Sequence, residues 1–314
     1  MDLGVQIEPQ YGFKFDEILA IANEARAAGF TRLWVSDHFF NDADAVATDC
    51  LEAWTLLAAL AVKTEGIRIG AMVTCQSYRN PAFLAKIAAG VDVMSGGRLE
   101  FGVGAGWKEF EYRAYGYEFP DAPTRVSQLI ETLEICTRMW KDERATYHGK
   151  HYRVDDALCS PKPAQHPLPI WIGGSKPRVM RTAARYASAF NFNAGTSAQT
   201  DKLKAAMREM DEICRAAKRD PKTLLRSSFL LSTVGSTAAR SAALLSELAT
   251  DQGTTPAEIL EKRPGLLRES PERALSQLRE YAALGIAHAN IMFQPYGSEH
   301  EQIAALAGIT AKLK

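Results

Sequence analysis

The stretch "TRLWVSDHFF" (31–40) combines features that rarely follow one another in a strand. Its first half is apolar and has the composition of a buried strand. It then ends in Asp37 and His38, two residues that are poor strand formers and costly to bury without partners. Such an ending is typical of a turn or of the wall of an active site. The place of this strand in the whole chain decides between the two.

Short apolar runs of this kind recur along the chain and alternate with segments of helical period, such as 51–64, 125–140 and 238–262. The runs are "LGVQI" (3–7), "TRLWVSD" (31–37), "IRIGAMVT" (67–74), "RLEFGVGA" (98–105), "PIWIGG" (169–174), "AFNFNAG" (189–195), "SSFLLSTV" (227–234) and "HANIMFQ" (288–294). Repeated β-α units favour a parallel sheet, and eight of them favour its closure into a barrel. The sequence therefore predicts an α/β fold, a (β/α)8 TIM barrel, in a single domain over residues 1–314. A doubly wound open sheet is the runner-up.

Residues 144–168 interrupt the alternation after the fourth β/α unit. The segment has the composition of a small hairpin around His148 and Gly149, followed by a proline-rich loop. No linker flanks it, so we expect an insertion within the one domain. Long loops of this kind are often functional, and we expect this one to act as a mobile lid.

The composition narrows the classes of partner and cofactor. Lys+Arg and Asp+Glu number 37 each, so no basic excess predicts nucleic acid or an anionic membrane surface as a partner. The five cysteines are scattered, and neither they nor the histidines have the spacing of metal ligands, so we expect no metal site and no disulfide framework. The first ten residues lack the profile of a signal peptide, and no apolar run has membrane-spanning length. A cytoplasmic protein that acts on a small molecule is the expectation.

Residues with chemical potential recur where the predicted strands end, which is the edge that carries active sites in parallel barrels. They are Asp37, His38, Thr74, Cys75, Gln76, the stretch 102–107, the stretch 173–176, Asn191 and Asn193. A lone histidine is more often a buried residue bonded to a backbone carbonyl. Beside an acid at a strand end, however, His38 is a candidate proton partner, because imidazole titrates near neutrality. The "GGSK" turn before Pro177 predicts either an anion seat at a helix N-terminus or an ordinary turn.

Several motifs together resemble one known family. They are "GFTRLWVSDHF", "RNPAFLAKIAAGVDVMSGGRLEFGVGAGW", "AYGYEFP" and "PIWIGG". This combination is similar to the luciferase-like monooxygenase superfamily and, within it, to the coenzyme F420-dependent oxidoreductases. The resemblance runs from residue 3 to about residue 194 and is weaker beyond. It implies a deazaflavin bound across the strand ends of the barrel, with hydride transfer at C5 of its ring.

The resemblance also implies roles for particular residues. His38 stands beside the ring as a proton partner, and a cis peptide lies between Met72 and Val73 in a bulge beneath the ring. The phosphate of the cofactor lies at the 173–175 turn, and Lys176 and Arg178 lie where an oligoglutamate tail emerges. The residues expected to bind the cofactor are Asp37, His38, Met72, Val73, Thr74, Cys75, Ala105, Gly106, Trp107, Gly173, Gly174, Ser175 and Lys176.

One departure from the family bears on the substrate. Family members that oxidise sugar phosphates carry an acidic residue where this sequence has Trp107. A tryptophan there favours an apolar or aromatic substrate, such as an activated alkene, imine or carbonyl. We expect Trp54, Trp107 and Asn193 to contact this substrate, although a tryptophan in an apolar run is more often a core residue. Two alternatives stay open, an FMN-dependent monooxygenase on the same barrel and a non-catalytic flavin- or deazaflavin-binding protein. The resemblance also implies a homodimer.

Overall fold

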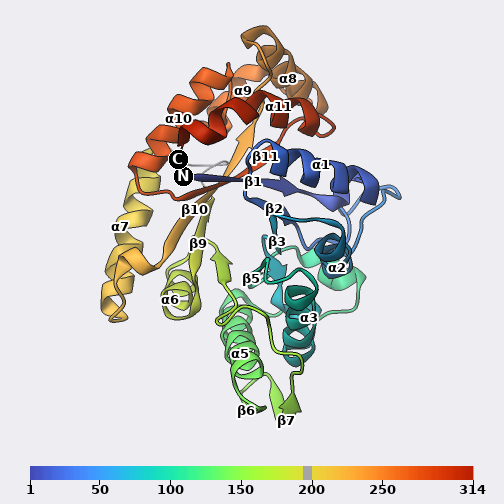
Figure 1. Ribbon diagram of the computed structural model, residues 1–314, viewed down its shortest axis with the longest axis vertical. Helices are drawn as coiled ribbons and strands as arrows, with labels where there is room; N and C mark the ends of the chain where they lie inside the picture. The colour runs from blue at the N-terminus through green and yellow to red at the C-terminus, as the bar shows by residue number, and fades with distance from the viewer. Residues whose placement is uncertain (194–199, 314) are drawn as a thin grey trace.

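The computed structural model describes residues 1–193 and 200–313 (Figure 1). Within them a ring of parallel strands forms the centre of the molecule, and β3 and β4 act as one strand with an interruption. The strands of the ring are β1 (Asp2–Ile7), β2 (Arg32–Val35), β3 (Arg68–Ala71), β4 (Thr74–Cys75), β5 (Leu99–Gly104), β8 (Ile170–Gly173), β9 (Ala189–Asn193), β10 (Leu225–Ser232) and β11 (His288–Phe293). A separate antiparallel hairpin consists of β6 (Arg144–His148) and β7 (Arg153–Leu158).

The pairing of β3 with β5 closes the ring into a barrel. The strand order is β3-β2-β1-β11-β10-β9-β8-β5, and Ile69 of β3 lies beside Leu99 of β5 in parallel register. An open sheet would leave β3 and β5 as two unpaired edges. The structure therefore confirms the predicted TIM barrel and excludes the doubly wound alternative.

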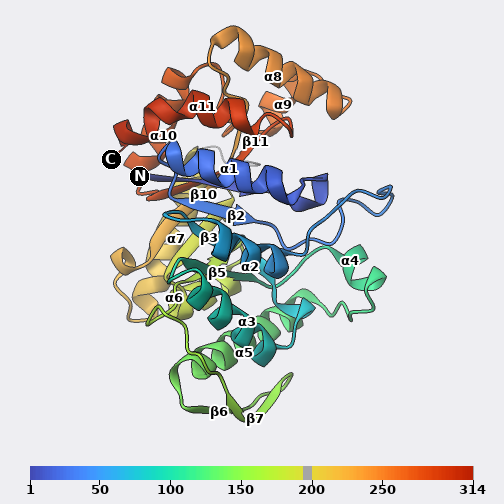
Figure 2. The ribbon, with the colours of Figure 1, turned by 45° about the vertical axis from the view of Figure 1, so that its right-hand side comes forward.

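Helices surround the barrel (Figures 1 and 2). They are α1 (Phe15–Ala27), α2 (Ala53–Lys63), α3 (Pro81–Met94), α4 (Glu109–Ala114), α5 (Ala122–Lys141), α6 (Pro177–Tyr186), α7 (Thr200–Ala216), α8 (Ala238–Asp251), α9 (Pro256–Lys262), α10 (Pro271–Ala283) and α11 (Glu299–Thr310), with short 3-10 turns η1 (Pro9–Tyr11), η2 (Gln76–Tyr78), η3 (Pro221–Thr223) and η4 (Ala311–Leu313). The segment expected as one helix over 238–262 is two helices, because Gly253 has a φ of 59° and ends the first. None of the described helices is long and apolar enough to cross a membrane.

Two tryptophans fill the interior of the barrel. Trp34 of β2 and Trp171 of β8 are fully buried, and their ring centroids lie 4.8 Å apart. Glycine on a neighbouring strand makes this possible, because a Cβ at Gly70 would lie 2.7 Å from the ring of Trp34. The interior is therefore a packed core and not a channel.

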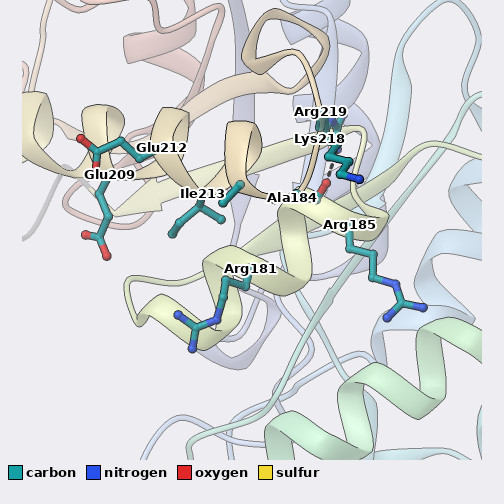
Figure 3. A pocket seen from close by; sticks show the side chains of 10 residues that line it. Arg181, Ala184, Arg185, Glu209, Glu212, Ile213, Lys218 and Arg219 are labelled. Atoms are coloured by element: carbon teal, nitrogen blue, oxygen red, sulfur yellow. Dashed lines mark hydrogen bonds between the residues drawn. The ribbon is translucent and has the colours of Figure 1, made fainter.

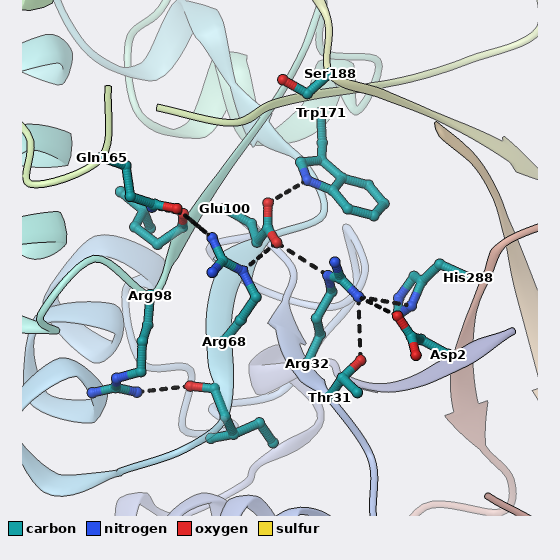
Figure 4. Close-up of polar contacts among 12 residues, drawn as sticks. Asp2, Thr31, Arg32, Arg68, Arg98, Glu100, Gln165, Trp171, Ser188 and His288 are labelled. Atoms are coloured by element: carbon teal, nitrogen blue, oxygen red, sulfur yellow. Dashed lines mark hydrogen bonds and ion pairs between the residues drawn. The ribbon is translucent and has the colours of Figure 1, made fainter. Parts of the chain in front are cut away.

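A buried polar cluster lies at the amino ends of the strands (Figure 4). Glu100 is 3% exposed and accepts hydrogen bonds from Trp171 Nε1 at 2.6 Å and from Arg32 Nε at 3.1 Å. Burial, together with the nearby charge of Arg32, holds the pKa of His288 well below its usual range. The neutral His288 ring accepts a hydrogen bond from Trp34 Nε1 at 3.2 Å. These hydrogen bonds hold the two tryptophan rings from the amino ends of the strands.

The insertion is present where the sequence predicted it, between α5 and β8. Glu131 of α5 accepts hydrogen bonds from the N–H groups of residues 150–152 and holds the hairpin turn against the helix. Tyr152 of the hairpin donates to Gln76, just after β4, at 3.0 Å. Gln165 of the proline-rich loop donates to the carbonyl of Leu99 at the start of β5, at 2.8 Å. The insertion is thus bound at both ends of the barrel, and its role as a mobile lid stays a prediction.

Because β3 and β5 lie close together, we predict that adding one methyl group between them lowers the stability of the protein. A Cβ at Gly102 would lie 1.8 Å from the carbonyl oxygen of Ala71, so the backbone of one strand must shift. We expect Gly102→Ala to lower the free energy of unfolding by more than about 2 kcal/mol in urea denaturation. The matched control is Gly308→Ala in α11, where no atom lies within 4 Å of the new Cβ and stability should rise by up to about 1 kcal/mol. Equal midpoints for the two variants would contradict the prediction.

Candidate active site

A cavity of about 400 Å³ opens at the carboxyl ends of β2, β4, β5 and β8. The residues that border it are Ser36, Asp37, His38, Met72, Val73, Thr74, Cys75, Tyr78, Gly104, Ala105, Gly106, Trp107, Lys108, Gly173, Gly174, Ser175, Lys176 and Val179. Every residue that the sequence assigned to the cofactor is among them. The fold thus gathers residues from four β/α units at the edge where barrel chemistry takes place.

A larger groove lies on the outer surface between α6 and α7 (Figure 3). Its volume is about 980 Å³, and charged side chains such as Arg181, Arg185 and Glu209 extend into it from both helices. No residue that borders it lies at a strand end among the described residues. Because active sites of barrels lie at the carboxyl ends of the strands, we place the site in the smaller cavity.

The interruption between β3 and β4 forms one wall of the cavity. The peptide between Met72 and Val73 is cis, as the resemblance implied. Val73 packs against a bare backbone, because a Cβ at Gly104 would lie 2.6 Å from its Cγ2 atom. The amide of Met72 donates to the carbonyl of Val35 at 2.9 Å and ties the bulge to β2. The wall is therefore built from backbone and from one small apolar side chain.

The carboxylate of Asp37 is bound by groups of the protein. Its carboxylate forms two hydrogen bonds of 2.8 Å with Arg79 and accepts a third, at 2.9 Å, from the backbone N–H of Cys75. Its side chain is 1% exposed. Both oxygens are thus bound to protein groups. Asp37 joins the end of β2 to β4 and fixes the shape of the wall, and its expected polar contact with a cofactor stays a prediction.

His38 faces the cavity and is held from behind. Its Nδ1 lies 2.9 Å from Oε2 of Glu111, whose side chain is completely buried, while the His38 side chain is 18% exposed. The ring of Trp107 lies edge-on to it, with centroids 5.9 Å apart. Burial alone would raise the pKa of Glu111, but the hydrogen bond and charge of His38 and the N–H of Phe39 lower it overall. The site therefore contains a carboxylate–imidazole pair.

The turn after β8 has the features of an anion seat. Ser175 and Lys176 are exposed at the start of α6, and no side chain caps its first turn. The free N–H groups of such a turn favour a phosphate. Arg178 donates to the carbonyl of Pro123 at 2.6 Å and to Ser127 Oγ at 2.8 Å, so its guanidinium is bound to α5. The expected place of Lys176 and Arg178 at the exit for a cofactor tail stays a prediction.

The three residues expected to contact substrate have separate positions. Trp107 is 71% exposed at the cavity. Trp54 is 3% exposed and packs in the hydrophobic core, with its ring centroid 6.0 Å from that of Phe101, so its assignment to the substrate is wrong. Asn193 ends β9, and its side chain lies outside the described part of the chain.

Comparisons with known proteins agree with this geometry. Residues 3–307 match the family described as luciferase-like monooxygenase. The chain belongs to the luciferase-like monooxygenase family. This confirms the resemblance that the sequence motifs predicted.

Several relatives of this luciferase-like protein are named for coenzyme F420. An F420-dependent glucose-6-phosphate dehydrogenase from Amycolatopsis mediterranei is 26% identical over 307 residues, which are 91% of this chain and 90% of the relative. An F420-dependent hydroxymycolic acid dehydrogenase from Mycobacterium tuberculosis is 32% identical over 224 residues, 71% of this chain and 60% of the relative. The structure of an F420-dependent secondary alcohol dehydrogenase has a TM-score of 0.83 at 20% identity and covers 100% of this chain and 99% of that one.

Sequence reasoning missed Glu111 in this luciferase-like chain. The residue lies 73 positions from His38, on α4, a helix of six residues that is too short to show a helical period. The available signal was the glycine turn at the end of β5, where Gly106 has a φ of 77°. A charged segment that follows such a turn lies over the strand ends, where acidic residues are candidates for chemistry.

Proposed function

We propose that the chain is a coenzyme F420-dependent oxidoreductase that transfers a hydride between C5 of the deazaflavin and a small organic substrate. The observation that carries the proposal is the single cavity in which a backbone-lined wall, an anion seat and a histidine come together. The names of the relatives support the same cofactor.

The residues present fit this cofactor. Gly104, Gly106, Gly173 and Gly174 border the cavity without side chains. A Cβ at Gly106 would lie 1.9 Å from the hydroxyl of Tyr112, so this wall has to remain bare backbone. A flat ring needs such a slot, and the phosphate of its side chain fits the N–H groups at the start of α6. When bound, the deazaflavin supplies the hydride donor or acceptor.

The residues of the chain supply the remaining functions. His38 is the proton partner, because it is the imidazole that borders the cavity and imidazole is the commonest general acid–base group in enzymes. Trp107 covers the open side of the cavity with an apolar surface. Lys176, exposed beside the anion seat, attracts the acidic tail of the cofactor. Asp37 and Arg79 keep the bulge in place.

The substrate we propose is an activated alkene, imine or carbonyl that the dihydro-cofactor reduces. Trp107 supports an apolar substrate, since it exposes an indole where sugar-phosphate oxidising relatives are expected to carry an acid. The protein is proposed to act on a free small molecule, and a cytoplasmic location stays a prediction.

The choice between F420 and FMN gives the first prediction about function. Fluorescence titration of the purified protein should show binding of F420 that weakens as salt rises, because charge interactions at the surface are screened. Lys176→Ala should weaken F420 binding by up to about fivefold, since an exposed charge contributes about 0–1 kcal/mol. The matched control is Lys222→Ala in η3, just before the amino end of β10 and far from the cavity, and it should change nothing.

Two results would replace the proposal by its alternatives. Tight binding of FMN with no binding of F420 would favour an FMN-dependent luciferase-like monooxygenase. Binding of F420 without turnover by any electron acceptor or donor would favour a non-catalytic deazaflavin-binding protein.

A substitution of His38 gives the second prediction about function. His38→Ala should keep the affinity for F420 and lose about 10²- to 10⁴-fold in turnover, because general acid–base help is worth that much. The control is His148→Ala, whose side chain is 51% exposed on the hairpin. Turnover of His38→Ala equal to that of the control would assign His38 to a purely structural role.

We also propose a homodimer formed through α2 and α3, which lie side by side on the outer surface (Figure 2). Val62, Phe83 and Met94 are 61%, 61% and 48% exposed on these two helices and would be covered in such a dimer. Phe83→Glu should convert the dimer to a monomer in light scattering after size exclusion. Val46→Glu, at an 83% exposed position on another face, is the control. A monomeric wild-type protein would reject the proposal.

A further inference from the structure

We propose that Glu111 is a positioning residue that fixes the proton of neutral His38 on Nδ1, so that Nε2 is the nitrogen that serves the reaction. The statement about the imidazole rests on the contacts of Glu111 and on its charge. Its catalytic meaning rests on the proposed function.

The carboxylate of Glu111 is surrounded by donors. Oε1 accepts from the backbone N–H groups of Phe39 at 2.7 Å and Phe40 at 3.3 Å. Oε2 accepts from the hydroxyl of Tyr78 at 3.0 Å and lies 2.9 Å from His38 Nδ1. The side chain is completely buried, so these groups replace water as its partners. A carboxylate with this many donors is held in one orientation.

The direction of the His38 hydrogen bond follows from the charge on Glu111. Burial would raise the pKa of Glu111, but the contacts with His38, with the N–H of Phe39 and with Lys108 outweigh it, and the pKa is lowered. An ionised carboxylate can only accept hydrogen bonds. The hydrogen between Glu111 Oε2 and His38 Nδ1 therefore belongs to the imidazole. In the neutral ring, Nε2 then carries the lone pair.

The other charged and titratable groups near His38 and Glu111 form hydrogen bonds or ion pairs with groups of the protein. Lys108 Nζ lies 3.8 Å from Glu111 Oε1 and donates to the carbonyls of Phe40 and Asn41 at 2.9 and 2.6 Å. The Asp37 carboxylate is taken up by Arg79. The thiol of Cys50 donates to the backbone carbonyl of His38 at 3.2 Å. Within the described residues, Glu111 is thus the one acid bonded to the imidazole.

The arrangement suits proton transfer in both directions. Reduction of an alkene, imine or carbonyl adds a hydride and a proton to the substrate. The hydride comes from the dihydro-cofactor of the proposed function, and protonated His38 gives the proton from Nε2 and later regains one from water. The carboxylate stabilises the protonated ring. In the oxidative direction the Nε2 lone pair accepts the proton.

The decisive experiment is nuclear magnetic resonance of the cofactor-free protein labelled with ¹⁵N-histidine. His38→Asn assigns the signals, since it removes one of the six histidines. Above the titration of His38, the wild-type ring should carry its hydrogen on Nδ1. In Glu111→Gln the amide oxygen can still accept from Phe39 and Phe40, so its NH₂ group faces Nδ1, and the hydrogen of the ring should move to Nε2. A wild-type His38 protonated on Nε2 overturns the inference, whether or not the variant folds.

Kinetics supplies the second measurement. Glu111→Gln should lose about 10²- to 10⁴-fold in kcat with little change in KM, because the ring presents the wrong nitrogen. The limb of the pH profile that reports His38 should move to lower pH, since the protonated ring loses a negative partner. Unchanged kcat and pH profile in a folded Glu111→Gln would overturn the positioning role.

Two variants separate positioning from folding. Glu109→Gln changes the same residue type on the same helix, where the side chain is 48% exposed and paired with Arg113, and should leave the spectrum and kcat unchanged. Tyr78→Phe removes one donor from Glu111 but keeps the bond to His38, so the hydrogen should stay on Nδ1. If the hydrogen lies on Nδ1 but the protein does not turn over F420, the proposed function fails and the assignment of the hydrogen stands.

Discussion

Neighbouring strands of this barrel carry glycine at several positions, and the site depends on these glycines. The positions are Gly70 of β3, Gly102 and Gly104 of β5, and Gly173 of β8. Without a Cβ at Gly70, the indole of Trp34 can cross the interior and pack on Trp171. Without one at Gly104, Val73 can enter from the bulge between β3 and β4. Large side chains thus fill the interior at the amino end, and bare backbone lines a slot at the carboxyl end.

Three buried carboxylates are neutralised in two different ways. Glu100 is paired with Arg32 and Arg68, and Asp37 with Arg79. A guanidinium stays charged at any pH a protein survives, so these pairs are permanent and hold backbone in place. Glu111 has an imidazole and neutral donors as its main partners. Its charge balance changes when the imidazole gains or loses a proton. A buried carboxylate therefore holds backbone at Asp37 and Glu100, whereas at Glu111 it faces a group whose charge can change.

The sequence predicted the barrel well because each β/α unit is local, with a period that is visible in the chain. Strand ends were predicted for the same reason, and they brought the cofactor residues to one cavity. Contacts between residues of different β/α units could not be predicted from the sequence. Glu111 belongs to a six-residue helix, and Arg178 donates to the carbonyl of Pro123. The prediction for Trp54 failed differently, since composition does not show which face of a helix a side chain occupies.

The exposed indole of Trp107 supports the proposed preference of the cavity for apolar substrates. An aromatic side chain can bury about 150–250 Å². With 71% of the residue exposed, a substrate that covers the ring could remove much of that area from water, worth up to about 4 kcal/mol or nearly a thousandfold in affinity. A hydrated sugar phosphate gains little of this, because its polar groups have to stay solvated or find donors. The ring lies edge-on to His38 with centroids 5.9 Å apart, so a substrate drawn to the indole is brought beside the imidazole. Under the proposed function, apolar contact with the substrate and proton transfer to it would thus take place at one point of the cavity.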